Sequence, residues 1–216
     1  MGGVFNSPAG KLVRSWLFQG VLYMSPDELL FRIAAEVAVI GAVWWLIADP
    51  VSWSGVLAVI VVHTLFWLVN SHFWALEIRK GVRLVKNRPQ AVKNYLEALR
   101  GRCTRCRSIK WCFASGSLAR GAFGVYSDLD VACIPRPGNW NRIVVLAFGM
   151  RERLIAAFKR MPVELYCYSE EALAHISPEE CRLVLKGPGK ADGDMQRWMS
   201  WDCFWDSPSE FFQQCE

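Results

Sequence analysis

Charge is almost absent from one long stretch of this 216-residue chain, because Asp49 is the only charged residue between Val37 and Leu76. The whole chain is 53% hydrophobic and 21% charged, which excludes an intrinsically disordered protein. A mean hydropathy of +0.17 is high for a soluble enzyme and low for a polytopic membrane protein, so it indicates two unlike parts. No A-x-A-like cleavage site follows the apolar stretch, so a secretory signal peptide is not expected.

The charge-poor stretch predicts two apolar helices, at about residues 30–48 and 56–76, joined by a turn rich in Pro, Ser and Gly. Each is close to the roughly 20 residues that a membrane-spanning helix needs. Ser25, Pro26 and the acids after them form a helix-start pattern before the first one. We therefore expect a transmembrane hairpin over residues 30–76, after an amphipathic segment over residues 1–29. The alternative is a buried helical hairpin in a soluble domain.

Basic residues predict the orientation of this hairpin. Eleven Lys and Arg stand between Glu77 and Lys110, others precede the first span, and the turn has none. The positive-inside rule then places both termini in the cytoplasm. Residues 77–107 form a basic helical linker, for which three interpretations stay open: attraction to anionic membrane lipids, attraction to nucleic-acid or nucleotide phosphates, and topology alone.

Two groups of polar residues invite specific hypotheses. Glu36 lies inside the first span, and we expect it either to meet Asn70 or His72 across the hairpin or to reach the cytoplasmic headgroups. Cys103 and Cys106 form a lone C-x-x-C, which lacks the second pair that a structural zinc site needs. Cys112, Cys133 and His175 are conceivable further ligands, but ordinary thiols are the expected state.

The segment Lys110–Pro137 carries the most chemistry. It predicts a buried strand to Ala114, a tight turn over residues 115–117, a short helix ending near Gly121, and a second strand that opens with Ser127-Asp128-Leu129-Asp130. A phosphate can approach the backbone of Gly116 closely, and Ser117 stands at a helix start, where free N–H groups favour an anion.

Alternate residues of a strand face the same side, so Asp128 and Asp130 point together as a pair that could hold Mg²⁺. A helix is predicted over residues 141–160, and its apolar side is expected to carry Ile143, Val144, Leu146, Ala147, Met150, Leu154, Ala157 and Phe158. The strand that follows it, over residues 161–168, contains Glu164 as an isolated acid. Such a carboxylate is costly to bury unless it is paired or bound to metal, so Glu164 is expected beside the two aspartates.

This order of residues resembles the nucleotidyltransferase superfamily related to DNA polymerase β, and more narrowly its minimal branch with the pattern GS-x-x-RG…SD-x-D. The resemblance covers about residues 108–190. It implies an α/β mixed sheet with flanking helices, in which Asp128, Asp130 and Glu164 bind Mg²⁺ or Mn²⁺ and act in catalysis. The substrate-binding positions that it implies are Gly116, Ser117, Arg120 and Ser127. Glu164 and Ser115 depart from the family's commoner Asp and aromatic residue.

We therefore expect a membrane-anchored, cytoplasm-facing enzyme that transfers a nucleoside monophosphate from a nucleoside triphosphate to an acceptor, with membrane lipids as further partners. The acceptor is unknown, its place is expected to be at the membrane, and nucleic acid is not an expected partner. The alternatives are a catalytically inactive nucleotide-binding module and a toxin–antitoxin-like regulator. Residues 191–216 form an acidic, aromatic tail, which we expect to pack on the basic linker or on the catalytic domain.

Overall fold

The computed structural model describes residues 13, 16–17, 25–47, 53–70, 86–170, 181–187, 198–206 and 212. The chain divides into two compact units, Met1–Phe73 and Trp74–Glu216, and each is described by itself. Most of residues 1–29, which were predicted to form an amphipathic segment, lie outside the described residues. Residues 71–85 and His175 lie outside them as well.

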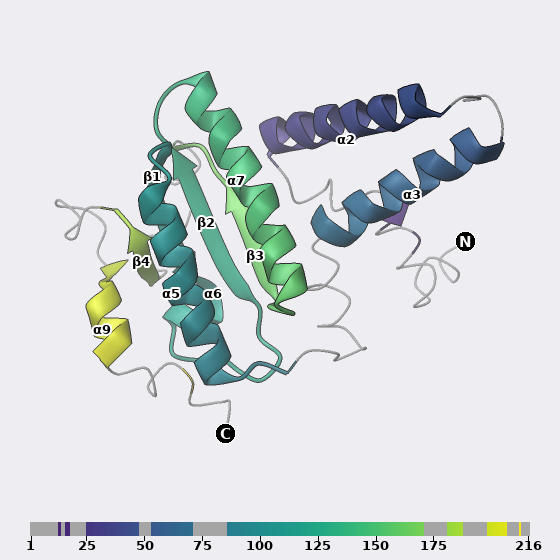
Figure 1. Ribbon diagram of the computed structural model, residues 1–216. Coiled ribbons are helices and arrows are strands. Elements are labelled where there is room, and N and C mark those ends of the chain that lie inside the picture. Colours follow the sequence, from purple (N-terminus) through teal and green to yellow (C-terminus); the bar gives the residue numbers. More distant parts are fainter. Residues whose placement is uncertain are drawn as a thin grey trace, which may run out of the picture. The chain divides into compact units, whose positions relative to one another are not determined.

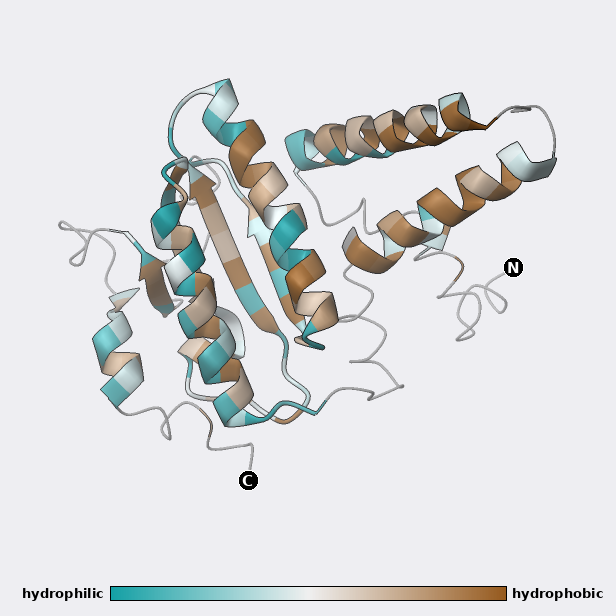
Figure 2. Ribbon diagram, viewed as in Figure 1, coloured by the Kyte–Doolittle hydropathy of each residue, from teal (hydrophilic) through white to brown (hydrophobic). Residues whose placement is uncertain are grey.

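The N-terminal unit is built on two apolar helices that pack against each other, α2 (Pro26–Leu46) and α3 (Trp53–Asn70) (Figures 1 and 2). The predicted start of the first helix is confirmed, since the Ser25 side chain accepts a hydrogen bond from the Glu28 amide and Pro26 occupies the first turn. Many large apolar side chains of both helices are exposed, among them Leu30, Val37, Trp45 and Leu57.

Among the described residues, α2 alone is long and apolar enough to cross a membrane by length and composition. The apolar part of α3, Trp53–Val69, is shorter than that. Two spanning helices were predicted, and the described residues contain one candidate. The second predicted span runs to residue 76, beyond the described end of α3.

Glu36 does meet a polar side chain of α3, but that side chain is His63. The Nδ1 atom of His63 lies 2.6 Å from Glu36 Oε1, and its Nε2 atom lies 3.1 Å from the Trp16 carbonyl oxygen. His72 and the side chain of Asn70, the partners predicted from the sequence, lie outside the described residues. The pairing satisfies an ionisable group inside an apolar hairpin, where an unpaired carboxylate would be costly.

The C-terminal unit is a mixed five-stranded sheet in the order β3-β2-β1-β4-β5. The strands are β1 (Ile109–Ser115), β2 (Leu129–Pro135), β3 (Val163–Cys167), β4 (Arg182–Lys186) and β5 (Trp198–Met199). Strand β1 runs antiparallel to both β2 and β4, whereas β2–β3 and β4–β5 are parallel pairs. The expected α/β class, a mixed sheet with flanking helices, is thereby confirmed.

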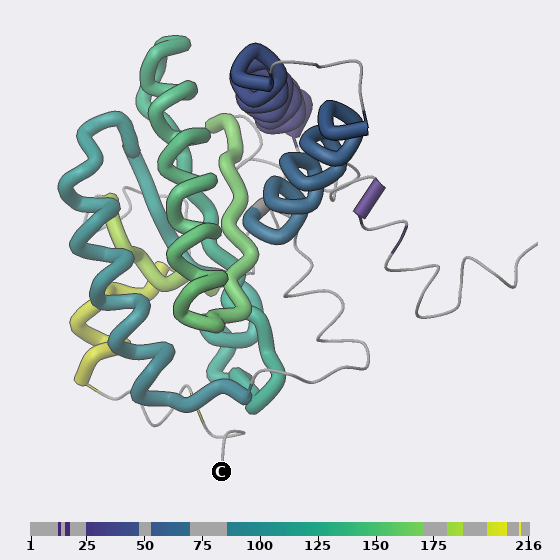
Figure 3. The backbone as a smooth tube through the Cα atoms, turned by 45° about the vertical axis from the view of Figure 1, so that its right-hand side comes forward, coloured from purple at the N-terminus to yellow at the C-terminus, as the bar shows by residue number. Residues whose placement is uncertain are grey.

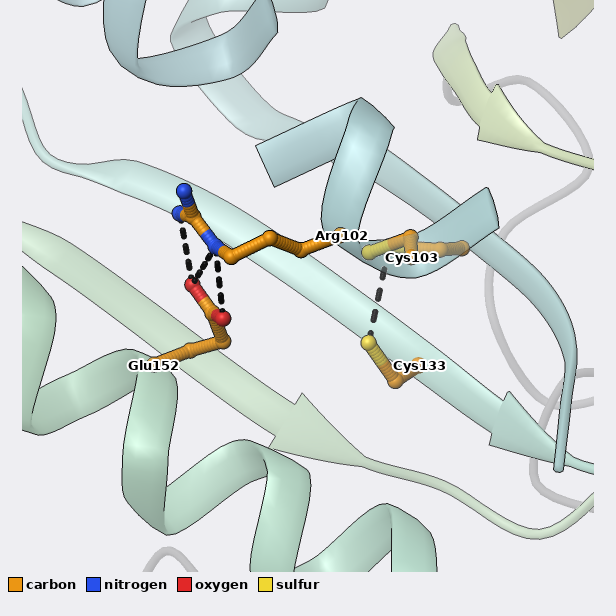
Figure 4. Close-up of polar contacts among 5 residues, drawn as sticks. Arg102, Cys103, Cys133 and Glu152 are labelled. Carbon is orange, nitrogen blue, oxygen red and sulfur yellow. Dashed lines mark hydrogen bonds and ion pairs between the residues drawn. The ribbon is translucent and has the colours of Figure 1, made fainter. Parts of the chain in front are cut away.

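Two long helices, α5 (Pro89–Arg105) and α7 (Asn139–Phe158), cover one face of this sheet (Figures 1 and 3). They are tied together by Arg102, whose guanidinium donates hydrogen bonds of 2.7–2.9 Å to both carboxylate oxygens of Glu152 (Figure 4). Glu152 is completely buried, so this ion pair lies inside the core, at the interface between the helices.

The predicted apolar side of α7 is largely wrong, although Leu146 is buried as expected. Ile143, Leu154 and Phe158 are 45%, 37% and 82% exposed, and the buried side of the helix carries Glu152 and Arg153. These two charged side chains can be buried because each has a partner. Glu152 pairs with Arg102, and Arg153 donates a hydrogen bond to the Leu165 carbonyl of β3. A satisfied pair of charges can thus occupy positions that hydrophobicity alone would assign to solvent.

The described part of the C-terminal tail packs on α5, as predicted. Helix α9 (Trp201–Asp206) follows β5, and cations of α5 lie over its rings, with Lys93 Nζ 3.9 Å from the Trp205 ring centroid. Trp201 and Phe204 are buried there. The predicted segments 77–107, 108–190 and 191–216 thus fall within one compact unit, in which α5 and the tail pack with the sheet.

Candidate functional site: a carboxylate cluster beside a glycine turn

Strand register brings the three predicted acids together. In the parallel pair β2–β3, Asp130 stands directly opposite Glu164, and Asp128 immediately precedes β2. One carboxylate oxygen of each residue lies within 4.8 Å of those of the other two. The convergence expected from the sequence is therefore present in the structure, and we call this group the acid trio.

The acid trio is poorly accessible to water. Asp128 is 9% exposed and Glu164 is 6% exposed, whereas Asp130 is partly exposed. Carboxylates so close together repel one another, and burial strengthens the repulsion because water screens it less. A divalent cation removes that repulsion, and carboxylate oxygens are the ligands that Mg²⁺ and Mn²⁺ prefer. The donor set therefore fits such an ion.

Gly116 lies directly against this group. Strand β1 ends at Ser115, which pairs with Asp130, and Gly116 then turns the chain with a φ of +71°. A Cβ atom at this position would stand 2.1 Å from Oδ2 of Asp130, far inside any real contact. Both the backbone angle and the contact thus require glycine here, and the turn approaches the acid trio more closely than any other residue type would permit.

The other predicted substrate-binding residues follow the same turn. Helix α6 (Gly116–Ala119) is a single turn, Ser117 is its second residue, and Arg120 caps its end with an exposed side chain. Ser117 is partly exposed, and its carbonyl accepts a hydrogen bond of 2.9 Å from the Ala122 amide. The turn therefore presents Ser117 and Arg120 at the end of β1 where the acid trio lies.

Ser127 has a local role in folding the loop before Asp128. Its hydroxyl accepts a hydrogen bond of 2.9 Å from the Gly124 amide. Buried Asn87 holds the same loop, since its side-chain amide donates to the carbonyls of Gly124 (3.1 Å) and Ser127 (2.6 Å). Asn87 was missed by sequence reasoning, because nothing local marks a residue forty positions away as the anchor of this loop.

Tyr166 is a second residue that sequence reasoning missed. Its hydroxyl donates a hydrogen bond of 2.5 Å to Oε2 of Glu164. Burial, together with the negative charge of Glu164 and hydrogen bonding to it, raises the pKa of Tyr166 well above that of an ordinary tyrosine. The phenol therefore stays protonated and orients the carboxylate. The signal was available, because Tyr166 is two positions from Glu164 in a strand and must share its face.

A second group with metal-ligating atoms lies elsewhere in the same unit. The Sγ atoms of Cys103, Cys112 and Cys133 lie within 4.8 Å of one another, and all three residues are completely buried. Hydrogen bonding with Cys112 and Cys133 lowers the pKa of Cys103 to about 5. Cys106, the other half of the C-x-x-C, is not part of this group.

Compared with protein-family models, with curated proteins and with solved structures, the chain matches none.

Proposed function

We propose that the C-terminal unit is a metal-dependent nucleotidyltransferase that moves a nucleoside monophosphate from a nucleoside triphosphate to an acceptor, with release of pyrophosphate. The observation that carries the proposal is the convergence of Asp128, Asp130 and Glu164 within 4.8 Å, directly against the Gly116 turn. The sequence pattern supports the same function, since the resemblance to the polymerase β superfamily assigns these acids to metal binding and this turn to the triphosphate.

Each residue has a role in this mechanism that follows from its place. The acid trio would hold Mg²⁺ or Mn²⁺, which when bound neutralises triphosphate charge and favours attack by the acceptor oxygen. Gly116 and Ser117 offer backbone N–H groups to the phosphates at the end of β1. Glu164, oriented by Tyr166, is the group we assign to accept the acceptor's proton or to assist its removal. Asn87 keeps the loop before Asp128 in place.

We further propose that the N-terminal unit anchors this enzyme to a membrane through α2, with α3 and the chain after it as a second span. Their exposed apolar residues and the absence of Lys and Arg from the turn support this arrangement. Both termini and the acid trio then lie in the cytoplasm, where the basic residues after the second span face anionic lipid. An acceptor at the membrane surface follows from this location.

Transfer of label from α-labelled nucleoside triphosphates to a membrane extract, with purified full-length protein and Mg²⁺, tests the enzymatic proposal. We expect Asp130→Asn to abolish transfer and to weaken Mn²⁺ binding, while Asp202→Asn, an exposed carboxylate on α9, leaves both unchanged. Mg²⁺-dependent nucleotide binding without transfer would instead support the inactive nucleotide-binding module. Equal Mn²⁺ binding by wild type and Asp130→Asn would refute the assignment of the acid trio.

Fractionation of cells tests the anchor. Val37 is 61% exposed near the middle of α2, and a lysine there costs about 3 kcal/mol in a bilayer. We expect Val37→Lys to reduce the membrane-bound fraction, whereas Ile143→Lys, at an exposed apolar position of α7, leaves it unchanged. Equal recovery of both variants in the membrane fraction would contradict a spanning role for α2.

A further inference from the structure

The buried cysteines form an ordered arrangement across the sheet. Cys112 of β1 is in register with Cys133 of β2, and Cys133 is in register with Cys167 of β3. The three residues thus form a row across neighbouring strands, on the face that α5 and α7 cover. Cys103 of α5 completes the group, with its Sγ 3.4 Å from that of Cys112 (Figure 4 labels Cys103 and Cys133).

This group is separate from the acid trio. Asp130 and Cys133 are three positions apart in β2, and Glu164 and Cys167 are three apart in β3, so the acids and the thiols point to opposite faces of the sheet. The cysteines lie under the helices, where Cys103, Cys112 and Cys133 are each 0% exposed. No step of the proposed reaction uses them.

The chemistry of the group is that of a soft-metal site. A lone buried cysteine acts as a small apolar side chain, but three sulfur atoms directed at one another from a helix and two strands form a preorganised set of thiolate donors. Their Sγ–Sγ separations of 3.4 and 3.5 Å are close to those that a shared ion would impose. Sulfur ligands select Zn²⁺ or Cu⁺ over Mg²⁺, which requires oxygen.

We propose that Cys103, Cys112 and Cys133 bind one thiophilic metal ion, Zn²⁺ or Cu⁺, which fastens α5 to the sheet. Each thiol that is still protonated loses its proton as its sulfur–metal bond forms, so binding of the ion releases protons to solvent. The number of sulfur ligands distinguishes Zn²⁺ from Cu⁺ at this site. Zn²⁺ in a structural site takes four ligands, and Cys167 is the available fourth, since it stands in register with Cys133 on the neighbouring strand β3. Its Sγ now donates a hydrogen bond of 3.6 Å to the carbonyl oxygen of Val145 in α7.

Metal analysis of the full-length protein, purified in detergent under anaerobic reducing conditions, tests this inference. We expect about one ion per chain, which is lost in Cys112→Ser and kept in Cys106→Ser, the matched control from the same C-x-x-C. Loss of the ion in Cys167→Ser identifies four-coordinate Zn²⁺, and its retention identifies three-coordinate Cu⁺. Co²⁺ substitution gives an independent readout, through sulfur-to-metal charge-transfer bands that Cys112→Ser removes.

A second measurement covers the case in which Cys112→Ser folds poorly. Addition of Zn²⁺ or Cu⁺ to metal-free wild type, at about a hundredfold excess over Kd, is expected to raise Tm by about 5–10 °C. The same rise is expected for Cys203→Ser, whose cysteine is exposed on α9. Absence of bound metal together with an unchanged Tm would overturn the proposal. So would equal metal loss in Cys106→Ser, or a Cys103–Cys112 disulfide in the protein as isolated.

Discussion

Replacing Gly116 by Ala tests the link between the turn and the acid trio. The added Cβ would stand 2.1 Å from Oδ2 of Asp130, where ordinary contact begins at 3.4 Å, so the carboxylate or the turn must move by the difference of about 1.3 Å. Alanine at a φ of +71° costs a further 1–2 kcal/mol, roughly. A misplacement of about 1 Å at a reacting centre typically lowers the rate by about a hundredfold.

We therefore expect Gly116→Ala to fold, with a Tm lowered by about 2–8 °C, and to transfer label at least about a hundredfold more slowly than wild type. Mn²⁺ binding, measured by calorimetry, should weaken in parallel because Asp130 is displaced. Gly101→Ala is the matched control, since Gly101 lies in α5 with no atom within 4 Å of an added Cβ. That change should stabilise the helix by about 1 kcal/mol and leave activity unchanged.

The reasoning would be refuted if Gly116→Ala bound Mn²⁺ and transferred label at rates within about twofold of wild type, a difference below 0.5 kcal/mol. Such a result would mean that the turn and Asp130 can separate without consequence. The close approach of Gly116 would then serve only the packing of the strand ends, and the triphosphate would have to bind elsewhere.

Three further predictions concern the supports of the site. Arg102→Met leaves buried Glu152 without its cation and should cost about 3–5 kcal/mol of unfolding free energy in urea, most of which Arg102→Met with Glu152→Met should restore. Asn87→Ala should weaken Mn²⁺ binding by about 5–30-fold in calorimetry, because the loop before the acid trio loses two hydrogen bonds, whereas exposed Asn94→Ala should not. Tyr166→Phe should weaken Mn²⁺ binding by about tenfold in calorimetry, because the Glu164 carboxylate loses the hydrogen bond that orients it, and unchanged binding would place the ion elsewhere.

The parts of this fold that the sequence predicted are those controlled by local pattern. The strands beginning at Ile109 and ending at Pro135 and the helix start at Pro26 follow from apolar runs, Pro and Gly, which act over a few residues. The acids could be placed together because strand periodicity fixes which side each faces. Their distance could not be, since it depends on the register of β2 against β3, which is set by contacts far apart in the chain.

The parts that escaped prediction depend on long-range pairing. The burial of Glu152 and Arg153 on α7 could not be predicted from the sequence, because their partners come from α5 and β3. Glu36 was expected either to pair with Asn70 or His72 or to reach the headgroups, whereas its partner is His63, which depends on how the two helices are rotated about their axes. Asn87 had no signal of its own, since its partners are carbonyl groups of a loop forty residues later.

The position of Asn87, near the start of the described part of the C-terminal unit, has a mechanical consequence. It stands two residues before α5, and its side chain holds the loop that ends at Asp128. Tension applied to the chain before Asn87 would therefore reach the loop before Asp128 through three hydrogen bonds, two from the Asn87 side chain and one from its backbone amide to the Val125 carbonyl.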